Sequence, residues 1–232
     1  MSGRQQKDLI GSAPSQALDF FERRFSGQGC RLIAGVDEAG RGPLAGPVVA
    51  AAVILPFSAF QEGFWDSKKL QPEMRESLYE KILKVAVSIG TGVIEAEEID
   101  QINIGRATQK AMAKAVRLLN RKPEMLLVDG SLPIPLPMPQ RTIVKGDNLC
   151  VSIGAASIVA KVTRDRIMTS YHEKYPQYNF AKHKGYGTQE HLDAIRRHGY
   201  CEYHRKTFKG VKGSLPHSST LSGQSGFIFD GS

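Results

Sequence analysis

The sequence has few cysteines and no long apolar run. Its three cysteines, Cys30, Cys150 and Cys201, are odd in number and far apart, so they form neither a disulfide framework nor a metal-ligand motif. This pattern fits a reducing compartment, and we expect a cytoplasmic protein. The longest apolar stretch, residues 48–55, is too short to span a bilayer, and the N-terminus lacks the apolar core of a signal peptide. We therefore expect no membrane association.

Basic residues outnumber acidic ones. The 232 residues include 31 lysines and arginines against 23 aspartates and glutamates, a formal net charge of +8. Such a balance favours a nucleic-acid partner, although many basic proteins bind none. We expect one large domain over residues 29–212. A polar extension with a short helix would precede it (1–28), and a disordered Ser/Gly-rich tail would follow it (213–232).

Hydrophobic periodicity predicts interleaved strands and helices. Apolar β-prone runs indicate strands near residues 32–36, 48–55, 85–94, 125–128 and 142–144. Amphipathic or small-residue stripes indicate helices that begin at Pro72, after Asn103 and after Thr188, and another through 153–167. Because strands come early and helices interleave later, we expect an α/β domain with a mixed sheet.

The segment 35–47 carries the strongest chemical signal. Asp37 and Glu38 stand side by side where an apolar strand ends. Side chains alternate along a strand, so both can share one site only if the chain turns there. Glycines on either side of Arg41 allow unusual backbone angles and expose N–H groups, and the guanidinium suits phosphate. Carboxylates for a hard divalent metal beside a donor-rich loop predict a phosphodiester-cleaving site.

Two more acids stand at strand ends. Asp129 follows the strand near 125–128, and Asp147 follows the strand near 142–144. Either acid alone, next to a glycine, could belong to an ordinary turn. Together, four carboxylates at three strand ends predict one site that holds two Mg²⁺ or Mn²⁺ ions for an in-line displacement. Asp165 is expected to pair with an arginine, and it is an alternative fourth ligand.

Cations stand in three further places. Lys184 and Tyr186 belong to a segment of lysines, glycines and an aromatic ring, which suits a nucleic-acid backbone with a stacked sugar as well as a plain solvated loop. Lys68, Lys161 and Arg164 are each compatible with phosphate contacts or with an ordinary surface. These residues therefore leave both interpretations open.

In combination, the motifs resemble the ribonuclease HII family, the type 2 ribonucleases H of bacteria. The similar blocks run in family order between residues 30 and 212: 35–43, 66–70, 128–130, 145–147, 152–165 and 183–186. Gly154 stands where the family more usually has alanine, a helix-weakening change without evident chemical meaning.

The resemblance implies a ribonuclease H-like fold, with a central mixed five-stranded sheet flanked by helices and a helical C-terminal part. It also implies a metal-dependent endonuclease that hydrolyses RNA in RNA–DNA hybrids and incises 5′ to single ribonucleotides in duplex DNA. The products would carry 3′-hydroxyl and 5′-phosphate ends. The biological roles would be ribonucleotide excision and removal of hybrids during replication.

The resemblance also implies roles for particular residues. The Mg²⁺ or Mn²⁺ ligands would be Asp37, Glu38, Asp129 and Asp147. The backbone of Gly40, Arg41 and Gly42 would read the 2′-hydroxyl, and Tyr186 would stack at the RNA-to-DNA junction. Phosphate contacts would come from Lys68, Lys161, Arg164 and Lys184.

Two other classes of protein stay open at this stage. An integrase-type nuclease would share the carboxylates, lack the ribose reader and cut all-DNA substrates. A module that only binds nucleic acid would keep the basic surface without turnover, which four intact acids argue against. We expect a monomer, and the apolar cluster Phe227, Ile228 and Phe229 in the tail is a candidate docking peptide for a replication protein.

Overall fold

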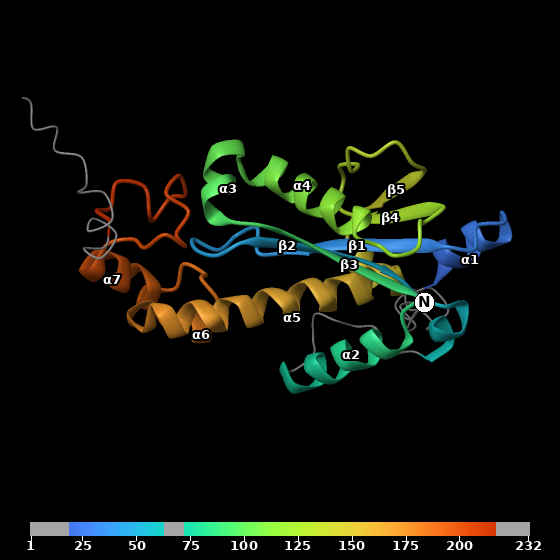
Figure 1. Cartoon of the computed structure of the whole chain (residues 1–232), viewed down its shortest axis with the longest axis horizontal. Coiled ribbons are helices and arrows are strands. Elements are labelled where there is room, and N and C mark those ends of the chain that lie inside the picture. The colour runs from blue at the N-terminus through green and yellow to red at the C-terminus, as the bar shows by residue number, and fades with distance from the viewer. Residues whose placement is uncertain (1–18, 63–71, 217–232) are drawn as a thin grey trace, which may run out of the picture.

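The structure, a computed structural model, describes residues 19–62 and 72–216 of the chain. Its centre is a five-stranded sheet of strand order β3-β2-β1-β4-β5 (Figure 1). The strands are β1 (Ile33–Ala39), β2 (Val48–Ile54), β3 (Ser88–Ile94), β4 (Met125–Asp129) and β5 (Gln140–Ile143). The β1–β2 and β2–β3 pairs are antiparallel, whereas β1–β4 and β4–β5 are parallel. The sheet is therefore mixed, as expected.

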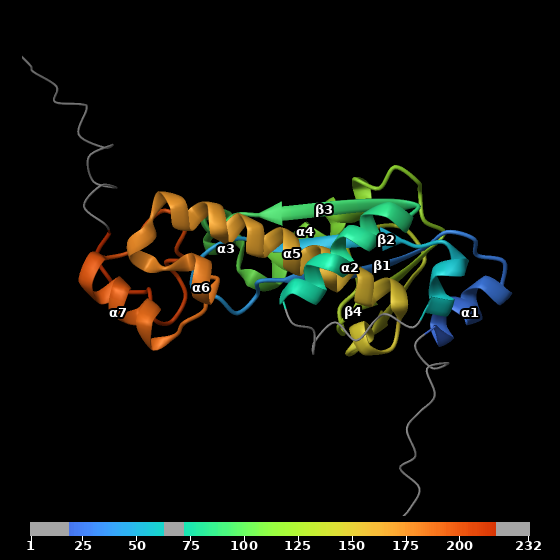
Figure 2. The same ribbon diagram turned by 90° about the horizontal axis from the view of Figure 1, so that it is seen from below.

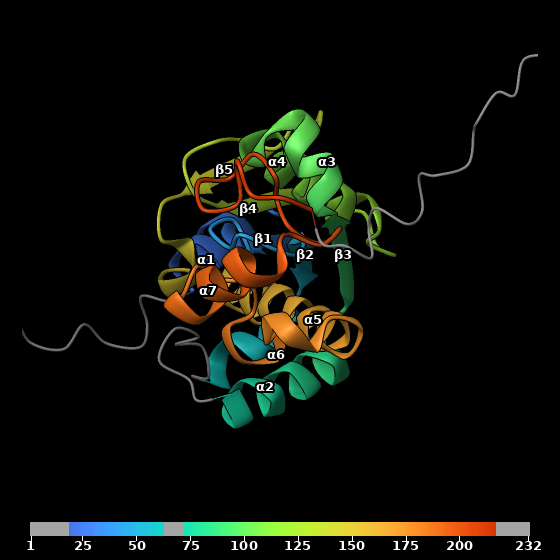
Figure 3. The ribbon, with the colours of Figure 1, turned by 90° about the vertical axis from the view of Figure 1, so that its left-hand side faces the viewer.

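Helices cover both faces of the sheet. They are α1 (Phe20–Gly27), α2 (Pro72–Val85), α3 (Ala96–Ile102), α4 (Ile104–Arg117), α5 (Val151–Lys174), α6 (Phe180–His183) and α7 (Gln189–His198). One face packs against α4 and the other against α5, while α2 lies on the outer side of α5 (Figure 3). Near the C-terminal end of α5, α6 and α7 form a helical part (Figure 2). The expected five-stranded sheet with a helical C-terminal part is confirmed.

Close contact between backbones holds these layers together. A Cβ atom at Gly35 of β1 would overlap the backbone of Ser152 and Ile153 in α5. On the other face, a Cβ at Gly92 of β3 would overlap the carbonyl of Ala111 in α4. With helices this close on both sides, every residue of β2 is buried. The first turn of α5 is thereby fixed directly against Gly35 of β1.

Some expected boundaries were wrong. We expected the third strand to start at Val85, but α2 continues to that residue and β3 begins only at Ser88. The valines at 85 and 87 are exposed, so their alternation straddles a helix end and a connection rather than a strand. Similarly, Val144 is exposed and follows β5. Short apolar alternation at an element end does not distinguish a strand from a partly exposed turn.

The N-terminal helix belongs to the same body as the sheet. Glu22 of α1 is 0% exposed, and its Oε1 accepts hydrogen bonds from the backbone N–H (3.0 Å) and hydroxyl (2.7 Å) of Ser152 at the start of α5. Burial raises the pKa of this carboxyl. Phe21 and Phe25 pack on the core beside Ile33. Helix α1 therefore packs on the sheet and on the start of α5, and the domain boundary at residue 28 stays a prediction.

Two expectations about the chain ends lie outside the described residues: the structure of the segment before residue 19 and the disorder of the tail after 216. Within the described ranges, no helix is both long enough and apolar enough to cross a membrane.

The contact between β1 and α5 predicts a large effect of Gly35→Ala. The added methyl group has to displace helix backbone, so the free energy of unfolding should fall by about 3 kcal/mol. Gly27→Ala is the matched control, because a Cβ at Gly27 meets nothing within 4 Å. Urea denaturation of the two variants would check this, and equal stabilities would contradict the close approach.

Candidate active site

Three carboxylates meet where β1 and β4 end. The two strands are parallel, and Val36 pairs with Val128, so Asp37 and Asp129 follow at neighbouring positions. Oxygens of Asp37, Glu38 and Asp129 all lie within 4.8 Å of one another. The parallel register thus brings together residues that are about ninety positions apart in the chain.

The two adjacent acids share the site without a turn between them. We expected the chain to turn at this point, but β1 continues through Ala39 and the turn begins at Gly40, which has φ +95°. The backbone N–H of Glu38 donates to Oδ1 of Asp37 at 2.7 Å. The longer glutamate side chain therefore reaches the aspartate from the same strand.

The electrostatics of this group favour the uptake of positive charge. Asp37 is 5% exposed, and its pKa lies well above the ordinary value, first because of burial and then because of the negative charges of Glu38 and Asp129. Hydrogen bonds from Ser157 and from the Glu38 N–H act in the opposite direction. Burial likewise raises the pKa of Glu38, against the opposing effect of Arg41, whose Nη1 lies 3.2 Å from Oε1. Mutually repelling carboxylate oxygens are the donor set that Mg²⁺ and Mn²⁺ prefer, so the residues fit a divalent ion.

Asp147 lies close in the fold but outside this group of three. It is 2% exposed in the 3-10 turn Gly146–Asn148, which follows β5. Its Oδ1 accepts a hydrogen bond from the Asn148 side chain at 3.0 Å. Gly146, the residue before Asp147, links this turn to the group of three carboxylates, because its backbone N–H donates to Oδ1 of Asp129 at 2.6 Å.

A cleft of about 350 Å³ opens beside the carboxylates. It is lined by Glu38, Ala39, Gly40, Arg75, Ser157, Ile158, Lys161 and Tyr186. Tyr186 is 46% exposed, and Cε1 of its ring would lie 3.8 Å from a Cβ placed on Gly42. A carboxylate, the glycine loop, a cation and an aromatic ring thus face one cavity.

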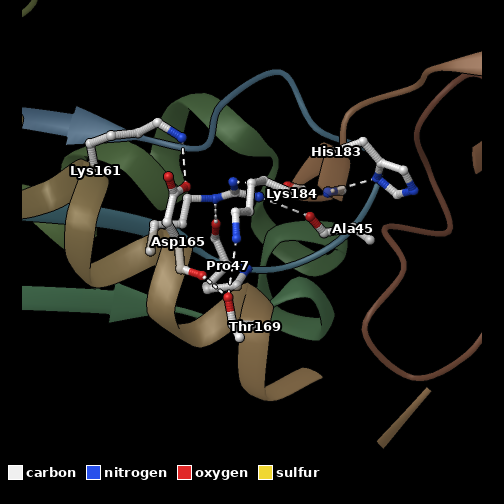
Figure 4. A network of polar contacts seen from close by, with 9 residues as sticks. Ala45, Pro47, Lys161, Asp165, Thr169, His183 and Lys184 are labelled. Atoms are coloured by element: carbon white, nitrogen blue, oxygen red, sulfur yellow. Dashed lines mark hydrogen bonds and ion pairs between the residues drawn. The ribbon is translucent and has the colours of Figure 1, made fainter. Parts of the chain in front are cut away.

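Two buried arginines hold the glycine loop between β1 and β2. Arg164 of α5 donates to the carbonyls of Pro47 (2.9 Å), Ala45 (3.0 Å) and Lys184 (3.0 Å) (Figure 4). Arg205 donates to three further loop carbonyls, those of Gly46 (3.0 Å), Arg41 (2.9 Å) and Gly40 (2.5 Å).

The predicted phosphate contact of Arg164 does not fit this environment. The residue is 1% exposed, and its guanidinium is committed to main-chain oxygens. Arg164 therefore orients the glycine loop from inside the protein rather than meeting substrate.

The predicted lysines have different environments. Lys161 pairs with Asp165 at 2.5 Å, so the partner of this acid is a lysine rather than the expected arginine (Figure 4). Lys184 donates to the Thr169 hydroxyl at 3.1 Å, and partial burial lowers the pKa of this lysine. Lys68 lies outside the described residues.

Sequence reasoning missed Ser157, Arg75 and Arg205. A signal for Ser157 was present, since polar residues recur every fourth position from it along the helix as Lys161, Asp165 and Thr169. For Arg205 no local signal existed, because only the tertiary structure places it beneath a loop more than 150 residues earlier in the chain.

The sheet topology and the clustered acids at its strand ends define a nuclease of the ribonuclease H-like type. Two solved structures share the architecture. The ribonuclease H2 from Pyrococcus horikoshii OT3 is 25% identical, with a TM-score of 0.68 over 78% of this chain and 95% of that one. The RNase HII in a PCNA complex from Archaeoglobus fulgidus is 27% identical, with a TM-score of 0.67 over 77% and 95%.

Sequence comparison narrows the class to one family. A family model described as Ribonuclease HII matches residues 34–211. The Ribonuclease HII of Syntrophus aciditrophicus (strain SB) is 59% identical over 201 residues, which cover 87% of this chain and 94% of that protein. That of Geobacter sulfurreducens is 53% identical over 210 residues, 90% of this chain and 97% of that protein. The chain belongs to the ribonuclease HII family and is a type 2 ribonuclease H, a metal-dependent endonuclease that acts on RNA–DNA hybrids.

The repulsion among the carboxylates predicts that Asp37→Asn stabilises the metal-free protein. Folding raises the pKa of this carboxyl. The free energy of unfolding therefore falls as pH rises from the pKa of the unfolded state towards the pKa of the folded state, and at neutral pH the native aspartate is destabilising. In EDTA at pH 7.5, the variant should melt a few degrees higher, about 2–4 °C for each kcal/mol. Adding Mn²⁺ should raise the melting temperature of the native protein and leave the variant nearly unchanged.

The control for this prediction is Asp193→Asn, which removes a charge from the exposed ion pair of α7 with Arg196. This variant should respond to Mn²⁺ like the native protein. A melting temperature of Asp37→Asn below the native value in EDTA would contradict the repulsion.

Proposed function

We propose that the enzyme incises duplex DNA on the 5′ side of a single embedded ribonucleotide, besides cutting RNA in hybrids, and leaves 3′-hydroxyl and 5′-phosphate ends. The observation that carries the proposal is the shared cleft, in which Glu38, Gly40 and Tyr186 face one cavity. Such a cut requires three elements: a carboxylate for the reaction, a loop for the ribose and a ring for the next sugar.

The acids are assigned to the metal. Asp37, Glu38 and Asp129 would hold Mg²⁺ or Mn²⁺, with Asp147 as the fourth carboxylate. When bound, such ions supply Lewis acidity that lowers the pKa of water and stabilises charge on the phosphate. The chain keeps the ligands in place: Ser157 orients Asp37, and the Gly146 N–H orients Asp129. Arg41, paired with Glu38, also places positive charge beside this carboxylate.

The glycine loop is assigned to the 2′-hydroxyl. Arg205 donates hydrogen bonds to the carbonyls of Gly40 and Arg41 from the protein interior, so the loop is ordered before substrate binds. The backbone of Gly40, Arg41 and Gly42 would then read the one group that separates RNA from DNA at this position. Because this loop approaches the Tyr186 ring at Gly42, ribose and neighbouring sugar would be read side by side.

Tyr186 is assigned to the sugar at the RNA-to-DNA junction, with nearby cations on the backbone. Lys161 lines the same cleft, and Lys184 directly precedes Gly185 and the ring. We keep Lys161, Lys184 and Lys68 as phosphate contacts and assign Arg164 to loop support instead. The cellular side of the proposal is a cytoplasmic monomer that excises ribonucleotides, with the tail as a docking segment for a replication protein.

One assay tests the reaction itself. Duplex DNA with a single ribonucleotide is offered with Mg²⁺ and Mn²⁺ separately, and the cut is mapped against an all-DNA duplex of the same sequence. The proposal requires one incision 5′ to the ribonucleotide and an intact all-DNA duplex. Cleavage of the all-DNA duplex would favour the integrase-type alternative.

Asp129→Asn should abolish cleavage and leave hybrid affinity within about tenfold. The carboxylate serves the metal, whereas affinity comes mainly from cations that contact phosphates. Turnover and filter binding on the same hybrid would measure the two effects. Near-normal turnover would remove Asp129 from the reaction.

Tyr186→Ala should lower single-ribonucleotide incision by about 10- to 100-fold, the scale of aromatic stacking on nucleic acid. Tyr186→Phe keeps the ring and should have a mild effect. The loss in Tyr186→Ala should be larger on the junction substrate than on a continuous hybrid, because only the former depends on one RNA-to-DNA step. Equal, small losses on both substrates would remove Tyr186 from junction reading.

A further inference from the structure

Three buried histidines lie behind the loop that carries Tyr186. His183 ends α6, His191 is in α7 and His204 follows that helix, and all three are nearly inaccessible to solvent. The rings of His183 and His191 stack with centroids 4.5 Å apart, and those of His191 and His204 are 5.2 Å apart. The proposed function assigns nothing to them.

Hydrogen bonds join two of these rings into a chain that ends on Tyr186. The backbone N–H of Cys201 donates to Nδ1 of His204 at 3.0 Å. Nε2 of His204 lies 3.1 Å from Nε2 of His191, and Nδ1 of His191 lies 2.9 Å from the Tyr186 carbonyl oxygen.

The groups at the two ends of this hydrogen-bond chain fix the direction in which its bonds donate. A carbonyl oxygen can only accept, so His191 carries its proton on Nδ1. A backbone N–H can only donate, so Nδ1 of His204 is bare and its proton is on Nε2. The Cys201 thiol, 3.2 Å from the same Nδ1, can then only act as a donor there. His204 therefore donates to His191, and the bonds run from Cys201 to Tyr186 without interruption.

Neither His191 nor His204 can take up a second proton without losing one of these hydrogen bonds. A second proton on either ring would point an N–H at another N–H, either between the two rings or at the Cys201 amide. Burial acts in the same direction, lowering the pKa of His191 to about 4 and that of His204 to about 3. Both rings are therefore neutral, and the chain is intact at physiological pH.

The loop that receives this chain has an unusual backbone. Lys184 (φ +51°) lies in the left-handed region, which residues with a side chain rarely populate, and Gly185 (φ +83°) follows it there as a glycine can without cost. The Gly185 N–H donates to Nδ1 of His183 at 3.2 Å, and the Gly185 carbonyl accepts from Leu44 N–H at 2.8 Å.

Tyr186 is held in the same way through its main chain. Its N–H donates to the His183 carbonyl at 2.9 Å, and its carbonyl accepts from Thr188 N–H at 2.8 Å besides His191. The half-exposed ring is thus placed mainly by what fixes its backbone.

We propose that His191, itself oriented by His204, is a positioning residue that holds the Tyr186 loop so that the ring meets the substrate sugar. The inference rests on the proposed role of Tyr186 at the RNA-to-DNA step. Neither histidine touches substrate, and each acts through hydrogen bonds to the main chain behind the ring.

The experiment compares His191→Phe and His191→Asn. Phenylalanine keeps a ring stacked on His183 but cannot donate to Tyr186, whereas the asparagine amide can replace the Nδ1 donor. His191→Phe should lower kcat/KM on the single-ribonucleotide duplex about tenfold and on a continuous hybrid less than threefold. His191→Asn should stay within threefold of native on both. His198→Phe, the same change on the same helix outside the chain, is the matched control and should match native.

A double-mutant cycle shows whether His191 acts through the ring. In a Tyr186→Ala background the ring is absent, so His191→Phe should change junction incision by less than twofold. All assays are run well below the melting temperature of each variant. If His191→Phe unfolds the protein, the cycle is run with His204→Phe, which keeps a ring but removes the donor that orients His191, and the same outcomes decide.

Two results would overturn the positioning role: equal losses on both substrates in His191→Phe, or an undiminished tenfold loss in the Tyr186→Ala background. Failure of the proposed function looks different, because Tyr186→Ala alone would then affect both substrates equally. If Tyr186→Ala lowers incision mainly on the junction substrate while His191→Phe lowers it equally on both substrates, the positioning role is overturned and junction reading by Tyr186 stands.

Discussion

The glycine loop depends on two buried guanidinium groups that donate six hydrogen bonds to main-chain carbonyls. Arg164 and Arg205 are 1% and 0% exposed, and burying such charges is costly unless every donor finds a partner. Burial lowers the pKa of Arg205 to about 9, so the group still carries its charge at neutral pH. Because the carbonyls accept from α5 and from the C-terminal part at once, these three segments form one unit. Removing either arginine would leave buried carbonyls without partners and release the glycine loop from the helices behind it.

The same helix that supplies Arg164 also serves the carboxylates. Close approach at Gly35 fixes α5 against β1, which brings Ser157 to Asp37 and Lys161 into the cleft. At the start of that helix, Glu22 holds Ser152. The carboxylates and the cleft therefore share one support. The repulsion among the acids is tolerated because the packing of the sheet and the helix fixes the carboxylates independently of any ion.

Much of the fold was predictable, because hydrophobic periodicity reports burial directly. The buried strand β2 and the helix capped by Asn103, whose side chain accepts from Arg106 N–H, were found close to their predicted positions. The errors occurred where burial is partial, at Val85, Val87 and Val144. Asp37, Glu38 and Asp129 were identified from their places at strand ends, and the parallel register brings them together. Asp147 was identified in the same way, but its place in the reaction is a proposal.

The sequence alone determined the chemistry: carboxylates at strand ends, glycines beside Arg41 and an aromatic ring among lysines. These are local patterns, and each residue type limits what it can bind. Only the tertiary structure decided which cations are buried and which line the cleft. Arg164 looked like a phosphate ligand in the sequence and lies inside, because three carbonyls from distant segments converge on it. His191 and His204 carried no local signal, since their direction comes from a donor at Cys201 and an acceptor at Tyr186. Hydrogen-bond partners far apart in the chain are set by packing, and a linear pattern does not encode them.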